Sequence, residues 1–208
     1  DLNGLVNSAD FECIGKKADE TPRLMLDIVE STDANIAIIG EGGIGKTTFL
    51  RKMLASMLRD ENDDPKPYDS TESIPIFIEL HRCPPAIANW KDPALNKTNF
   101  ITRYIAQILE NHSSLHQVSS KNLELIEKLM QGIPEKGQKP RFLLLLDGFN
   151  EVQSNKEIDV RSYLSNELSV LCSDEYKGVR ILTTSRPTET AYYARKFENI
   201  TAVGQQPD

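Results

Sequence analysis

The sequence predicts an α/β fold in which helices cover both faces of a parallel five-stranded sheet, giving a three-layer sandwich. Short apolar runs typical of buried strands alternate with segments whose apolar residues recur at helical spacing. Such alternation calls for a parallel sheet with right-handed crossovers. The length of 208 residues suffices for one domain with a substantial core. A glycine-rich turn joins the first strand of the sheet to a helix, and this order supports the same fold class.

The expected strands and helices follow from these apolar patterns. We expect strands at residues 35–39, 73–80, 141–147, 178–187 and 200–203. Pro75, in the second of them, is tolerated near the start of a strand or at a sheet edge. Helical spacing of apolar residues indicates helices within residues 49–58, 100–109, 123–130 and 158–171.

The segment before the first strand is expected to contain one helix. Thr21 is a suitable N-cap, and Pro22 follows at the first helical position. Leu24, Ile28 and Val29 then contribute to an apolar helix face.

The charge balance and the cysteine content narrow the range of partners and compartments. The chain carries 24 lysine and arginine residues against 31 aspartate and glutamate residues, a formal net charge of −7. This acidity argues against a general nucleic-acid-binding surface. No apolar run approaches a membrane span, and no signal peptide begins the chain. Three widely spaced cysteines fit a reducing compartment, so we expect a cytoplasmic protein without membrane or nucleic-acid partners.

Residues 40–48 match the phosphate-binding pattern G-x-x-x-x-G-K-[ST], known as the P-loop, at every fixed position. Glycines allow the backbone to form a concave turn whose N–H groups point at phosphate oxygens. Lys46 supplies a positive charge near the β- and γ-phosphates, and the Thr47 hydroxyl is placed to bind Mg²⁺. The predicted nucleotide-binding residues are Gly40, Glu41, Gly42, Gly43, Ile44, Gly45, Lys46, Thr47 and Thr48.

Asp147 is the candidate for the second metal ligand. Five apolar residues precede it, as expected for a strand buried on both faces that delivers a carboxylate to its C-terminal edge. In a P-loop protein such a carboxylate holds the hydrated Mg²⁺. The alternative is an ordinary strand that ends in a solvated aspartate.

Glu151 and Arg186 are the remaining candidates for catalysis, together with Asp147. Glu151 is the only other carboxylate in the segment that leaves the third strand, and we expect it to act as the base or to position water. Asn150 can orient water but cannot accept a proton at neutral pH. Arg186 follows the fourth strand, where an arginine can reach a γ-phosphate, although a surface arginine at a strand end is an equal alternative.

These motifs together resemble the NACHT group of STAND NTPases, signalling ATPases that include animal NLR immune receptors and bacterial defence proteins. The P-loop at 40–48, the Asp-Gly-Phe-Asn-Glu run at 147–151 and the Thr-Thr-Ser-Arg-Pro run at 183–187 all fit the pattern of the group. Ile14-Gly15-Lys16 is similar to a stretch that contacts the adenine side of the nucleotide, with Lys16 in place of the usual arginine. Asn150 stands where the group usually has a second acid.

The resemblance implies a P-loop NTPase fold of the ASCE type, with strand order 5-1-4-3-2 when the strands are numbered along the chain. It implies one nucleotide-binding domain over residues 1–208, made of a lead-in and helix at 1–34 and a P-loop core at 35–204. It also implies ATP or ADP with Mg²⁺ as ligands, and Ile14 and Lys16 as further nucleotide contacts. The helical, winged-helix and sensor segments that follow in the family are absent from this sequence. The sequence also lacks an initiator Met, so we expect a piece of a longer protein.

The leading functional hypothesis is an ATP-operated switch of a signal-transducing, defence-related protein. ATP with Mg²⁺ would favour an open, self-associating state of the full-length protein, and slow hydrolysis to ADP would reset it. The fragment alone is expected to be monomeric. One alternative is a module that holds nucleotide as a structural clasp without turnover, which Asn150 favours. Another is a GTPase or small-molecule kinase, although no Asn-Lys-x-Asp guanine motif is present.

Overall fold

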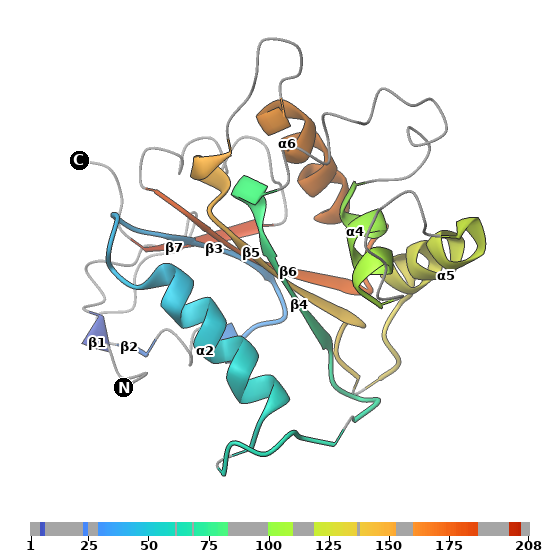
Figure 1. The fold of residues 1–208 in the computed structure, drawn as a ribbon, viewed down its shortest axis with the longest axis horizontal. Coiled ribbons are helices and arrows are strands. Elements are labelled where there is room, and N and C mark those ends of the chain that lie inside the picture. Colours follow the sequence, from blue (N-terminus) through green and yellow to red (C-terminus); the bar gives the residue numbers. More distant parts are fainter. Residues whose placement is uncertain are drawn as a thin grey trace.

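The computed structural model contains a parallel sheet of five strands (Figure 1). It describes residues 5–6, 23–24, 29–60, 62–67, 69–82, 100–109, 119–136, 138–152, 160–186 and 200–204. The strands are β3 (Asn35–Ile39), β4 (Ile74–Glu79), β5 (Phe142–Asp147), β6 (Val179–Ser185) and β7 (Ile200–Gly204). Their spatial order is β4-β5-β6-β3-β7, and every pairing is parallel. Both the α/β class and the predicted order 5-1-4-3-2 are confirmed.

Helices cover both faces of this sheet (Figure 1). Helix α2 (Lys46–Leu58) packs on one face, where its Leu50 and Met53 join Ile36 and Leu143 in one apolar cluster. The opposite face carries α4 (Phe100–Leu109), α5 (Ser120–Gln131) and α6 (Val160–Leu171). The three-layer sandwich is therefore confirmed.

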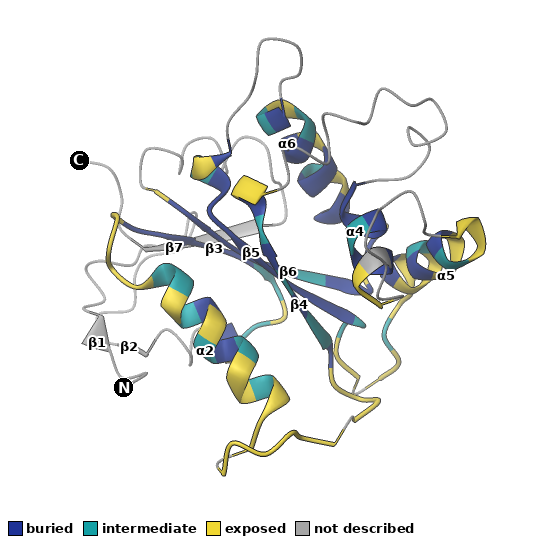
Figure 2. Cartoon of the chain, viewed as in Figure 1, coloured by how far each residue is buried: buried dark blue, intermediate teal, exposed yellow. Residues whose placement is uncertain are grey.

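Strand β5 lies in the interior of the sheet, and its two faces serve the two apolar clusters. Leu143 and Leu145 belong to the cluster under α2, whereas Leu144 and Leu146 belong to the cluster under the other helices. Alternate strand residues point to opposite faces, so a strand covered on both sides must be apolar throughout. All six residues of β5 are buried, including the terminal Asp147 (Figure 2).

Strand β4 is an outer strand of the described sheet, and Pro75 lies second in it. A proline cannot donate a backbone hydrogen bond, so an outer strand accommodates it without breaking a ladder. The expectation for Pro75 is therefore confirmed.

The expected helix starting at Pro22 is wrong over Arg23–Leu24. These residues form strand β2, which pairs antiparallel with β1 (Leu5–Val6). A backbone partner distant in sequence thus overrides the local helix signals. Val29 and Glu30 are helical, as expected, whereas Thr21, Pro22 and Ile28 lie outside the described residues.

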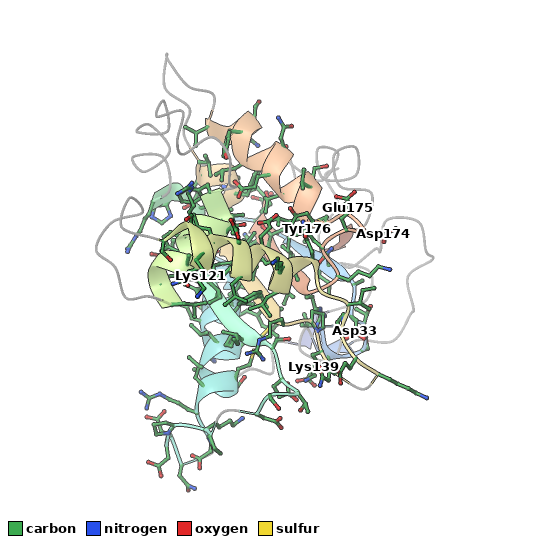
Figure 3. All side chains as sticks on the ribbon, turned by 90° about the vertical axis from the view of Figure 1, so that its right-hand side faces the viewer. Asp33, Lys121, Lys139, Asp174, Glu175 and Tyr176 are labelled. Carbon is green, nitrogen blue, oxygen red and sulfur yellow. The ribbon has the colours of Figure 1, made fainter. Side chains whose placement is uncertain are left out.

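Glu167 of α6 is a buried carboxylate that holds the N-terminal end of α4. Its Oε1 accepts a hydrogen bond from the backbone N–H of Ile101 at 2.6 Å. Burial raises the pKa of Glu167 to about 8, against the lowering effect of the backbone N–H groups at the start of α4. The charge of Glu127 on α5 raises it further. Glu127 itself accepts a hydrogen bond from the hydroxyl of Tyr176, which is labelled in Figure 3.

Candidate functional site

The glycine-rich turn lies between the end of β3 and the start of α2, at the C-terminal edge of the sheet. Gly43 and Gly45 have φ angles of 85° and 92°, a left-handed conformation that side chains disfavour. A Cβ placed on either residue, or on Gly42, would meet no atom within 4 Å. The backbone N–H of Gly40 donates to the carbonyl of Ser185 at 3.1 Å and ties the turn to β6. The backbone is therefore uncovered at Gly42, Gly43 and Gly45, as a phosphate-binding turn requires.

Lys46 begins helix α2 and folds back over the turn. Its Nζ donates to the carbonyls of Gly40 and Glu41 at 2.5 and 2.8 Å. An ammonium group has three donors, so one remains for a ligand oxygen. Thr47 and Thr48 follow in the first turn of α2, Thr47 half-buried and Thr48 exposed.

Several charged groups at this edge of the sheet affect the pKa of the Lys46 ammonium. Burial lowers the pKa of the Lys46 ammonium, and the positive charge of Arg186 lowers it further. The carboxylates of Asp147, Glu41 and Glu151 act in the opposite direction. All three predicted catalytic residues are therefore within electrostatic range of Lys46.

Asp147 ends β5 and is held by a threonine on the neighbouring strand. The Thr184 hydroxyl donates to Asp147 Oδ1 at 2.6 Å and accepts a hydrogen bond from the Gly148 N–H at 3.0 Å. Both side chains are buried, at 8% exposed for Asp147 and 1% for Thr184. One hydroxyl thus fixes the carboxylate and the backbone that follows it.

Thr184 was not among the predicted site residues. The signal that would have identified it is the Thr-Thr-Ser run at the end of the fourth predicted strand. Using that signal requires knowing that β6 lies beside β5 and which residue faces Asp147.

Gly148 turns the chain sharply after Asp147, and the Glu151 side chain folds back over Gly148. Its φ is 74°, and it precedes a short 3₁₀ turn, η4 (Phe149–Glu151), whose first residue is fully buried. The Glu151 N–H donates to the Gly148 carbonyl at 2.9 Å. A Cβ on Gly148 would lie 3.3 Å from Glu151 Oε2, so the carboxylate lies directly over Gly148. Asn150, which precedes Glu151 in the sequence, is half-buried.

The end of β4 and the turn after it contribute residues that were not among the predicted site residues. Glu79 pairs in register with Asp147 across the β4–β5 ladder. Its carboxylate binds Arg51 of α2 and Arg82, each at 2.8 Å. His81, in the following turn η2 (Leu80–Arg82), places Nδ1 4.0 Å from Glu151 Oε2.

Arg186 is exposed and follows directly after β6, so it lies at the predicted sheet edge. Ile14 and Lys16, the predicted adenine-side contacts, lie outside the described residues. The Thr47 hydroxyl and the buried Asp147 carboxylate are hard oxygen donors, the type that Mg²⁺ prefers. The donor set therefore fits Mg²⁺.

A strand, an open glycine turn, a helix that begins with lysine and a buried aspartate on a neighbouring part of the sheet define a P-loop NTPase. Among known families, the model of the NACHT domain matches residues 34–205. The chain belongs to this family, whose members are P-loop NTPases, and is therefore a nucleotide-binding NTPase domain.

Comparisons with individual proteins add less. No curated protein matches the chain. The chain is similar to a solved structure described as the cytoplasmic domain of EssC, at 14% sequence identity and a TM-score of 0.39. That match covers 96% of this chain and 37% of the other. Among the described residues, no helix has the length and hydropathy needed to span a membrane.

Proposed function

We propose that this domain binds ATP with Mg²⁺ and hydrolyses it slowly, as the switch of a signal-transducing defence protein. The observation that carries the proposal is that Asp147, Glu151 and Arg186 all lie within electrostatic range of Lys46, which begins the helix after the open glycine turn. We assign the core to residues 35–204 and a lead-in to residues 1–34.

Different residues would bind different parts of the Mg²⁺–ATP complex. Backbone N–H groups of the turn and Lys46 would hold the β- and γ-phosphates, and Arg186 would reach the γ-phosphate from the end of β6. Thr47 and Asp147 would hold Mg²⁺, which supplies charge stabilisation at the phosphate oxygens. Ile14 and Lys16 would contact the adenine.

Glu151 is the proposed base or water-positioning group. Its side chain is 57% exposed, so water can reach the carboxylate. Asp147 is buried and hydrogen-bonded to Thr184, an arrangement suited to holding a metal rather than to exchanging protons with water. Glu151 therefore has the access that Asp147 lacks.

Substitutions at three residues test this division of roles. Glu151→Gln should abolish phosphate release while ATP remains bound. Asp147→Asn should in addition weaken the dependence of ATP binding on Mg²⁺. Asn150→Asp, which restores the acid usual in the family, should leave the rate equal or faster.

The clasp hypothesis, in which nucleotide is bound without turnover, gives a different result. Asn150 favours it, because an amide cannot accept a proton. A slow wild-type rate of phosphate release that Glu151→Gln leaves unchanged would support the clasp and refute the switch. Parallel titrations with ATP and GTP test nucleotide choice, and stronger GTP binding would refute the ATP assignment.

In the full-length protein, ATP binding is proposed to favour self-association and ADP to oppose it. The domain alone should stay monomeric with either nucleotide. Light scattering that detects a defined ATP-dependent oligomer of the domain would contradict this.

A further inference from the structure

His81 lies against the proposed catalytic carboxylate but has no role in the function described above. Its Nδ1 is 4.0 Å from Glu151 Oε2, and the two side chains are 42% and 57% exposed. The distance exceeds that of a hydrogen bond, which spans about 2.7–3.2 Å, by less than the length of one C–C bond. In the turn that follows β4, His81 is therefore the residue that lies beside Glu151.

The backbone of His81 is held firmly at this place. Leu80, the preceding residue, is fully buried and anchors the turn in the core. Glu79, two residues before, ends β4 and pairs in register with Asp147 across the β4–β5 ladder. The imidazole thus projects from a fixed turn beside η4.

Glu151, in contrast, has few restraints on its carboxylate. Its backbone N–H is bonded to the Gly148 carbonyl, which fixes the main chain but leaves the side-chain torsions free. In the part of the chain that the structure describes, His81 supplies the side-chain nitrogen that lies 4.0 Å from this carboxylate. The charge on Lys46 acts on it from a longer range. An exposed glutamate loses much rotamer freedom when it is ordered, so a contact that orders it beforehand favours the reaction.

We propose that His81 is a positioning residue, which holds the Glu151 carboxylate over Gly148 where it can orient the attacking water. This inference rests on the proposed role of Glu151 in ATP hydrolysis. It makes the end of β4 part of the catalytic machinery, although His81 touches neither the glycine turn nor Asp147 in any described contact.

The kinetic test uses two substitutions at His81. His81→Ala should lower kcat by about three- to tenfold, the range expected when a catalytic group loses part of its orientation. KM for ATP should stay unchanged, because the glycine turn and Lys46 are intact. His81→Asn should restore most of kcat, since its amide nitrogen takes nearly the place of Nδ1. Arg82→Ala is the matched control, being the next residue in the same turn and bound to Glu79 instead.

Equal kcat losses in His81→Ala and His81→Asn, or a parallel rise of KM, would mean a merely structural role. Wild-type kcat in His81→Ala would also overturn the proposal.

A measurement without turnover separates this inference from the proposed function. The chain has three histidines, so the imidazole NMR signals of His81 are assignable from their absence in His81→Ala. Glu151→Gln should shift these signals, whereas Arg82→Ala should leave them nearly in place. If Glu151→Gln leaves the chemical shifts of His81 unchanged, the positioning role is overturned even if Glu151 proves to be the base. Signals that shift, combined with hydrolysis that Glu151→Gln leaves unchanged, would overturn the catalytic role of Glu151 and with it the purpose of His81.

Discussion

Replacing Thr184 by valine should destabilise the domain, because one buried hydroxyl serves two partners. The substitution keeps the shape of the side chain but removes the donor to Asp147 Oδ1 and the acceptor for the Gly148 N–H. A hydrogen bond to a charged group contributes about 1.5–3 kcal/mol, and a buried N–H left without a partner costs about 1–3 kcal/mol. The two effects share one site and are not additive, so we expect a loss of about 2–4 kcal/mol in the free energy of unfolding.

The preceding residue provides the control. Thr183 is also fully buried in β6, but its hydroxyl has no hydrogen-bond partner in the described part of the chain. Thr183→Val should therefore be neutral or slightly stabilising. Urea unfolding followed by circular dichroism measures the free energy of unfolding of both variants. In thermal unfolding, Tm should fall by about 5–15 °C for Thr184→Val and not for Thr183→Val. Equal stability of the two variants would refute the bridging role of Thr184, and so would unchanged Mg²⁺-dependent nucleotide binding in a folded Thr184→Val protein.

The other predictions concern affinity and pH. Lys46→Ala should weaken ATP binding at least about tenfold in calorimetry, because a charge-assisted contact is lost; unchanged affinity would refute the P-loop assignment. Arg186→Ala should lower the affinity for ATP but spare ADP, whereas equal losses would make Arg186 a general binding residue. The pKa of Glu167 is about 8 in the folded chain against an ordinary 4.5, so its contribution is fully present below pH 4.5 and is lost as pH rises through 8. Relative to Glu167→Gln, wild-type stability should fall by at most about 1.4 kcal/mol per pH unit in this window; parallel curves would contradict a buried, titrating carboxyl.

The sheet was predicted correctly from the sequence, and the proposed phosphate-binding residues were identified from it, because both signals are contiguous. The glycine turn with Lys46 is one uninterrupted stretch, and the apolar run before Asp147 reports a strand covered on both faces. Each such signal depends on neighbours along the chain. The prediction of a helix over Arg23–Leu24 was wrong for the opposite reason. The strand there depends on pairing with Leu5–Val6, and no local pattern reveals a partner so far away in the sequence.

Thr184 and His81 were not predicted as site residues because their contacts depend on register between strands. Thr184 reaches Asp147 only because β6 lies beside β5, and His81 reaches Glu151 only because β4 lies on the other side of β5. Contiguous motifs therefore indicate the groups that we propose to bind nucleotide, while the contacts of Thr184 and His81 across strands depend on the sheet order. This division makes an experimental difference. Changes in the glycine turn should lower nucleotide affinity. Changes at Thr184 should lower stability and Mg²⁺-dependent nucleotide binding, and changes at His81 should lower kcat. If substitutions at Thr184 and His81 changed neither stability, nor Mg²⁺-dependent binding, nor kcat, the motifs alone would determine the site. Strands β4 and β6 would then only support the fold.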